Sequence, residues 1–271
     1  MSPRSFFVIC LLPLAIFTLA FLALPLVRLF VSSISTESGF GIYVEILTNP
    51  RYMRSLLQTV LVSAAVTVAA LFISTTSGLF LVRNQFAGRG VLISVLTFPL
   101  AFPGVVIGFL IILLAGRQGL FNILAKDLFD ARLVFAYSMT GLFFGYLYFS
   151  VPRVLLTVMA AAEKLDLSLE EAARSLGASP IAVLRDVILP ALTPALIAAG
   201  AIAFATAMGA FGTAFTLATN IDVLPMIIYT EFTLSANIAM AAALSVVLGL
   251  VTWILLVISR SLTGGAIAAA G

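Results

Sequence analysis

The sequence contains few charged residues and no histidine. Only 9% of its 271 residues are Asp, Glu, Lys or Arg, whereas soluble globular domains contain about 25%. Hydrophobic residues make up 62% of the chain, and the mean hydropathy is +1.23. This composition excludes a water-soluble fold, and we expect an integral membrane protein.

Several kinds of chemistry are also missing. The single cysteine, Cys10, cannot form an internal disulfide. Without histidine, or a pair of carboxylates at membrane depth, there is no acid–base pair and no metal site, so we expect neither an enzyme nor a metal protein. The two lysines, Lys126 and Lys164, lie outside any Gly-x4-Gly-Lys-[Ser/Thr] loop. We therefore expect no cofactor in this chain.

Long apolar runs predict an all-α protein with six transmembrane helices. A bilayer-spanning helix needs about 20 apolar residues, and spanning β-strands would instead alternate over about 10 residues. The first run is longer than the 7 to 15 residues of a secretory signal core, so we expect it to be a span. The predicted spans are 6–31, 56–81, 91–115, 133–158, 192–219 and 238–259.

The spans suggest three parts of the chain. Residues 1–54 hold the first span and an external loop with a short amphipathic helix, 55–260 hold five further helices, and 261–271 form a C-terminal tail. The segments 117–132 and 220–237 are predicted to be exposed loops. Lys and Arg number eight on one side and six on the other, which favours both termini and residues 165–190 in the cytoplasm.

Some residues within the spans are candidates for a transport path. Pro99 and Pro103 interrupt the third span, either as a simple kink or as a bend that lines a path. Alanines repeat every fourth residue in the fifth span and predict an interface, within the bundle or with a second subunit. They are Ala191, Ala195, Ala199, Ala203 and Ala207. Candidate path residues, whose alternative role is packing, are Tyr137, Tyr146, Met208, Phe211 and Phe215.

Acidic residues are absent from the middle of the predicted spans, and so are basic ones. Secondary transporters and channels usually place ionisable groups there, so this pattern argues against both classes. Asp222 and Glu231, in the last external loop, are the acidic candidates for an external gate or a substrate loop.

Residues 165–190 are too polar to span a membrane. Ser168 and Glu171 fit a capping box, which predicts a helix from Leu169 that stops at Gly177. Ser179 followed by Pro180 predicts a second helix, ending against Pro190. Such helices could lie on a membrane surface, but their polar face is more acidic than basic, and an anionic leaflet would repel it. We therefore favour docking to a soluble protein.

The same residues resemble the EAA motif of membrane subunits of binding-protein-dependent ABC importers. That motif reads EAA, three residues, Gly, nine residues, Ile, one residue and Leu-Pro. Here it is matched by Glu171, Ala172, Ala173, Gly177, Leu189 and Pro190, with Val187 in the isoleucine position. The resemblance implies the type I importer permease fold. Residues 97–122 look most like the spermidine/putrescine branch, which implies a polyamine substrate; ferric iron, phosphonates and other small solutes are the alternatives.

The resemblance also implies partners and roles. Two cytoplasmic ABC ATPase subunits would bind ATP and Mg, a second permease, identical or different, would complete the path, and a periplasmic binding protein would deliver the solute. No nucleic acid is expected, and the location would be the bacterial inner membrane. Glu171 would contact the ATPase or cap the helix, Ala172 and Ala173 would pack in a groove, and Leu189 and Pro190 would transmit movement.

Overall fold

The computed structural model describes residues 3–35, 37–217 and 221–269. Regular structure in these residues is helical, and six segments are long and apolar enough to cross a membrane. The predicted all-α class and the count of six are confirmed. The segments are Leu11–Ser33, Pro50–Arg83, Gly104–Phe129, Met139–Ala162, Pro180–Met208 and Ile238–Ser259.

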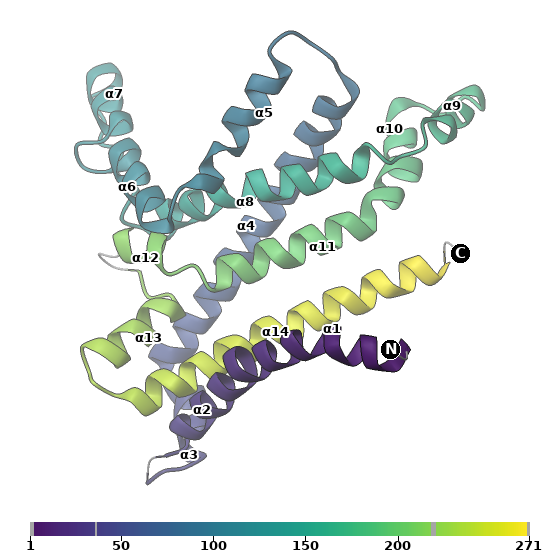
Figure 1. Cartoon of the computed structure of the whole chain (residues 1–271). Coiled ribbons are helices and arrows are strands. Elements are labelled where there is room, and N and C mark those ends of the chain that lie inside the picture. Colours follow the sequence, from purple (N-terminus) through teal and green to yellow (C-terminus); the bar gives the residue numbers. More distant parts are fainter. Residues whose placement is uncertain (1–2, 36, 218–220, 270–271) are drawn as a thin grey trace.

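The two ends of the chain lie side by side. Helix α1 (Pro3–Thr18), the π-turn η1 (Leu19–Ala23) and α2 (Leu24–Ser33) form one continuous rod, and α2 packs on α14 (Ile238–Ala269) (Figure 1). Helix α14 extends to Ala269, so most of the predicted tail continues the last span. Both termini lie at the end of the bundle that also carries α9 (Leu167–Ser175).

The first external segment is mostly helical. The predicted short helix is α3 (Gly41–Thr48), and α4 (Pro50–Arg83) follows it at once. Asn49 caps α4 because its side chain accepts a hydrogen bond from the amide of Arg51 at 2.9 Å. Pro50 suits the first helical position, where no amide hydrogen is needed. The second span therefore begins earlier than residue 56.

Prolines divide the third predicted span into separate helices. Helix α5 (Arg89–Thr97) passes into the 3₁₀ turn η2 (Phe98–Ala101), and α6 (Gly104–Ala115) begins after Pro103. Phe102 is extended, as expected of a residue before proline. Helices α5 and α6 diverge sharply in Figure 1. The segment 117–132, predicted to be a loop, contains α7 (Leu120–Phe129).

Helix α8 (Met139–Ala162) packs against α4 and α11 (Leu189–Met208). Ala199 and Ala203 of α11 are buried against Ala70, Val154 and Val158 of the other two helices. Ala207 is also buried, whereas Ala195 is half-buried and Ala191 is exposed. The small side chains let the helices approach closely, so most of the alanine stripe is an interface within the chain.

Proline does not end the helix before the fifth span. Helix α10 (Pro180–Val183) continues through the π-turn η3 (Leu184–Ile188) into α11, where the amide of Leu189 bonds to the carbonyl of Leu184. The predicted stop at Pro190 is therefore wrong. A π-turn also precedes Pro25 in the first span. In both places the wider turn lets the helix continue past a proline, which would clash in a regular α-helix.

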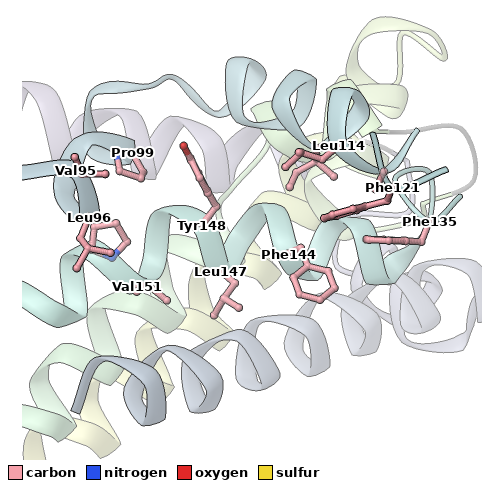
Figure 2. Close-up of a pocket in the computed structure, with 13 residues that line it drawn as sticks. Val95, Leu96, Pro99, Leu114, Phe121, Phe135, Phe144, Leu147, Tyr148 and Val151 are labelled. Atoms are coloured by element: carbon pink, nitrogen blue, oxygen red, sulfur yellow. The ribbon is translucent and has the colours of Figure 1, made fainter. Parts of the chain in front are cut away.

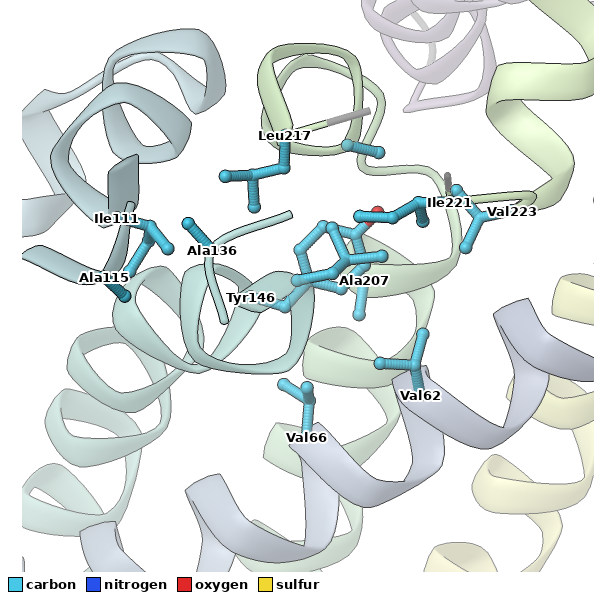
Figure 3. Close-up of a cluster of buried hydrophobic side chains, with 12 residues drawn as sticks. Val62, Val66, Ile111, Ala115, Ala136, Tyr146, Ala207, Leu217, Ile221 and Val223 are labelled. Carbon is cyan, nitrogen blue, oxygen red and sulfur yellow. The ribbon is translucent and has the colours of Figure 1, made fainter. Parts of the chain in front are cut away.

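The fifth predicted span is broken near its far end. Helix α11 ends at Met208, and α12 (Gly212–Leu217) follows after a short break. The predicted loop after it contains α13 (Leu224–Thr233); Thr219 and Asn220 lie outside the described residues. Tyr146 lies at the centre of the main core cluster (Figure 3). Its hydroxyl donates to the carbonyl of Ala210, in the break, at 2.5 Å.

The packing of α11 predicts the effect of enlarging one alanine. Ala203→Leu places extra methyl groups in a site that is 1% exposed, and overpacking of this kind costs about 1–3 kcal/mol. We expect a lower unfolding temperature for the purified protein, followed by loss of the monodisperse peak in size-exclusion chromatography. Ala198→Leu, on the exposed side of the same helix, is the matched control; an equal effect of both variants would contradict this packing.

Candidate functional site

An ion pair fixes α9 to the end of α4. Both terminal nitrogens of Arg83 donate to the carboxylate of Glu170, with Nη1 to Oε2 at 2.7 Å. Glu170 is 4% exposed, and Arg174 lies 3.9 Å from the same carboxylate. A bidentate contact between guanidinium and carboxylate restricts both position and orientation. Helix α9 is thereby held against the membrane-spanning bundle.

Gly177 forms the turn after α9. Its φ of +84° lies in the left-handed region that glycine adopts without strain. The amide of Gly177 bonds to the carbonyl of Arg174 at 2.9 Å, and the amide of Ala178 bonds to that of Ala173 at 3.0 Å. These two hydrogen bonds make a Schellman motif, which satisfies the last carbonyls of the helix.

The two helix starts differ in how well the sequence predicts them. The cap of α9 is Asp166, which accepts from the amide of Ser168 at 2.9 Å, so the predicted cap at Ser168 is wrong. Hydrogen bonds from Ser168 hold the pKa of the Asp166 carboxyl below its usual value. The predicted cap at Ser179 is confirmed, because its hydroxyl accepts from the amide of Ala182 at 3.3 Å.

The motif residues divide between an outer and an inner face. Glu171, Ala172, Gly177 and Pro190 are exposed, whereas Ala173, Val187 and Leu189 are half-buried. Leu169, Leu176 and Ile181 are also exposed, Leu176 at 89%. Beneath them, a core cluster of Ala162, Val183, Ile188 and Leu192 packs the stretch onto the bundle. The outer face thus combines a carboxylate with unburied apolar groups, as expected of a surface that binds a protein.

The role of Glu170 is not visible in the sequence pattern. Glu170 and Glu171 are adjacent, and only Glu171 belongs to the matched motif, so nothing in the pattern marks Glu170 as the buried one. Its partner Arg83 lies 87 residues away in the chain. One feature of the sequence does hint at this ion pair. Arg83 stands at the end of an apolar span, and from that position its long side chain can reach a carboxylate at the polar end of the bundle.

The candidate path residues lie in two groups. Tyr146 and Met208 are fully buried in the core, and Tyr137 packs beside it. Phe211 and Phe215 form a cluster with Tyr229, with ring centroids 5.2 to 5.4 Å apart. The structure therefore does not bring all five side chains to one surface.

The two acidic candidates of the last external segment have different surroundings. Glu231 lies in α13, is 6% exposed, and accepts a hydrogen bond from the hydroxyl of Tyr52 at 3.1 Å. Arg51 lies 4.0 Å from the same carboxylate. Asp222 is exposed in the segment before α13. Glu231 thus joins α13 to the start of α4, while Asp222 faces the surroundings.

One charged group lies deeper in the bundle than the sequence predicts. Helix α8 extends to Ala162, so Arg153 lies nine residues inside its end. That is about 14 Å at 1.5 Å per residue. The prediction that no charged residue approaches the middle of a span is therefore wrong for this helix. Arg153 donates to the hydroxyl of Thr206 at 2.6 Å.

A large cavity among the described residues is apolar. It has a volume of about 640 Å³ and lies between α5, α6, α7 and α8, in the gap where α5 and α6 diverge (Figure 2). Phe121, Phe135 and Phe144 line one end of it, and Val95, Leu96 and Pro99 the other. Its lining has no charged side chain, so it offers nothing to hold an ionic solute.

Comparison with known proteins identifies the family. Residues 70–264 match the family model "Binding-protein-dependent transport system inner membrane component". The matched segment includes the α9–α11 stretch and both broken spans.

Curated relatives extend over most of the chain. The molybdenum transport system permease protein ModB of Escherichia coli is 34% identical over 79% of this chain and 94% of its own length. The putative 2-aminoethylphosphonate transport system permease protein PhnU of Salmonella typhi is 31% identical over 94% and 91%. The sulfate transport system permease protein CysT of Salmonella typhimurium is 30% identical over 76% and 73%.

Solved structures share the fold. A bacterial alginate ABC transporter, in complex with an alginate-bound periplasmic protein, matches with a TM-score of 0.81 at 17% identity over 96% of this chain and 94% of that one. An inward-facing MetNI methionine ABC transporter matches with a TM-score of 0.55 at 16% identity, over 81% and 99%. These likenesses agree with the predicted permease fold.

The relatives also correct the predicted branch. They are named for molybdenum, 2-aminoethylphosphonate and sulfate, so the spermidine/putrescine assignment is not supported, and the alternative of another small solute fits better. The chain is the permease subunit of an ABC importer for a small solute, and it belongs to the family of binding-protein-dependent transport system inner membrane components.

Proposed function

We propose that this permease carries a tetrahedral oxyanion, of the class of molybdate, sulfate or a phosphonate, from the periplasm to the cytoplasm. ATP hydrolysis in two separate ATPase subunits drives the movement. The observation that carries the proposal is the α9–α10 surface, which is anchored from within by Arg83 and Glu170 and exposes Glu171, Ala172 and Leu176 outward.

The names of the relatives support the substrate class. Molybdate, sulfate and phosphonates share a central atom surrounded by negatively charged oxygens. Curated relatives named for all three are 30 to 34% identical to this chain. The chain is also basic, with a formal net charge of +3. A net positive charge favours the approach of anions and disfavours that of polyamines.

The continuity of the helix supports coupling through α9. Movement of α9 would reach α11 through η3, because α10, η3 and α11 form one helical segment of 29 residues. Val187 and Leu189 are half-buried at the join. In this scheme Glu171 contacts the ATPase directly, while Ala172 allows close approach of its groove.

The partners and the topology complete the proposal. A second permease, identical or different, pairs with this one, and a periplasmic binding protein delivers the anion. The termini and α9, which share one end of the bundle (Figure 1), lie in the cytoplasm. The segments around α3 and α13 then face the periplasm, where Asp222 is exposed.

Changing one exposed leucine tests the docking surface. Leu176 is 89% exposed, so Leu176→Glu should leave the permease folded but abolish co-purification of the ATPase, because it puts a charge into an apolar contact. Leu234→Glu, at a residue 74% exposed after α13, is the control at the opposite end. Retention of the ATPase by the Leu176 variant would place docking elsewhere.

Two adjacent glutamates test the anchor and the surface separately. Glu170→Gln removes the buried carboxylate charge that pairs with Arg83. It should lower the free energy of unfolding by about 1–3 kcal/mol. Glu171→Gln, at an exposed position, should change it by less than about 0.5 kcal/mol, yet weaken solute-stimulated ATP hydrolysis. Thermal unfolding and ATPase assays of the purified complexes measure both effects. Equal destabilisation by the two variants would refute this division.

The substrate class is tested with the complete importer. The complex and its binding protein, reconstituted in liposomes, should hydrolyse ATP several-fold faster when molybdate, sulfate or 2-aminoethylphosphonate is added. Spermidine at the same concentration serves as the comparison and should have no effect. Stimulation by spermidine, with no response to any of the three oxyanions, would overturn the proposed substrate.

A further inference from the structure

Arg153 is a cation at membrane depth. It lies about 21 Å along α8 from Met139 and about 14 Å from Ala162, at 1.5 Å per residue. Thr206, its hydrogen-bond partner, lies on α11. Within residues 3–35, 37–217 and 221–269, no carboxylate lies at ion-pair distance from Arg153. Uncompensated charge at this depth is costly and usually serves a function.

Arg153 lines a cavity of about 300 Å³. The cavity walls come from α8, from α11 and from both broken spans; they include Phe102, Gly104, Phe149, Gly209 and Gly212. Irregular backbone at membrane depth is tolerated where protein covers it or where it lines a water-filled cavity. Here both interruptions, at Pro103 and at Gly209–Phe211, meet at the same cavity.

The two breaks are fixed to each other. The hydroxyl of Thr213 donates to the carbonyl of Gly104 at 3.0 Å. A Cβ on Gly104 would come within 3.2 Å of the amide nitrogen of Thr213, so only a small residue allows this approach. The break after η2 and the break after α11 are therefore in direct contact on the wall of this cavity.

The start of α6 adds further positive potential. This helix has 12 residues and begins at Gly104, on the cavity wall. The first amides of a helix have no partner within it and carry partial positive charge. Pro103, in the cap position, offers no side-chain acceptor to them. The cavity thus combines one full positive charge with the positive end of a helix, whose first residue, Gly104, lies on its wall.

We propose that this cavity is an oxyanion-binding station on the transport path, with Arg153 as its charged ligand. Thr206 orients the guanidinium, whose remaining N–H groups suit the oxygens of a tetrahedral anion. A volume near 300 Å³ is at the small end of ligand sites. It suits a small inorganic or phosphonate anion and is too small for an oligosaccharide. The inference rests on the proposed oxyanion substrate and assigns the residue that recognises it.

Three variants of the complete importer separate an anion ligand from a structural tie. Arg153→Met keeps the length of the side chain but removes its charge, Arg153→Lys keeps the charge, and Thr206→Val breaks the same hydrogen bond while leaving Arg153 in place. The measurement is uptake of radiolabelled molybdate, and separately of sulfate, into liposomes that hold the complex, the binding protein and internal ATP. Thermal unfolding of each purified complex, with and without the same anion, is measured in parallel.

If Arg153 binds the anion, Arg153→Met should lower uptake by about tenfold or more, as expected from loss of a hydrogen bond to a charged group. It should also reduce the thermal stabilisation that the anion gives to the complex. Arg153→Lys should retain a measurable part of both, and Thr206→Val should lower uptake less than Arg153→Met.

Two outcomes would overturn the site. Uptake by Arg153→Met within about twofold of the unaltered importer would remove Arg153 from the path. Equal losses of uptake and of stability in Arg153→Met and Thr206→Val would make the contact a structural tie between α8 and α11. Failure of the unaltered importer to take up either anion, together with no stimulation of its ATPase by 2-aminoethylphosphonate, would instead contradict the proposed substrate, so the two failures are distinguishable.

Discussion

Every backbone amide and carbonyl at membrane depth needs a partner within the protein, and this constraint governs the whole molecule. Helices satisfy it over most of the chain. Where proline or glycine interrupts a helix, the structure compensates locally. Before Pro25 and Pro190 the helix widens into a π-turn and continues. The two full breaks lie against each other instead. The hydroxyl of Tyr146 donates to the carbonyl of Ala210 in one break, and the hydroxyl of Thr213 donates to the carbonyl of Gly104 at the other.

This arrangement connects the two ends of the fifth span. At one end, α9 leads through α10 into η3, and the Arg83–Glu170 ion pair holds α9 in place. At the other end, Ala210 in the break after α11 accepts a hydrogen bond from Tyr146, in the main core. Small side chains between these ends, such as Ala199 and Ala203, pack α11 closely on its neighbours. Helix α9 is thus connected through α10, η3 and α11 to the break that borders the Arg153 cavity.

The charged residues at the two ends of the bundle differ from Arg153 inside it. The Arg83–Glu170 pair lies at the end of the bundle, where burial of one carboxylate is offset by a bidentate partner. Glu231 is buried similarly at the opposite end, with Tyr52 and Arg51. Arg153 differs from both because its hydrogen-bond partner, Thr206, is a neutral hydroxyl. Its charge is available to an anion, whereas the charges at the two ends are largely satisfied by the protein itself.

The sequence by itself determined the membrane class, the number of spans, the turn at Gly177 and the family resemblance. These features depend on composition, on local backbone preference or on fixed spacing, and all three can be read directly from the order of the residues. It misplaced the end at Pro190, the cap at Ser168 and the depth of Arg153, and it gave no sign of the break at Gly209. Each of these depends on what lies beside the residue in space. Only the tertiary structure decided that Glu170 and not Glu171 is buried, because its partner comes from 87 residues away. Only the tertiary structure brought the two broken spans and Arg153 to one cavity, because their contacts join helices that are distant in sequence.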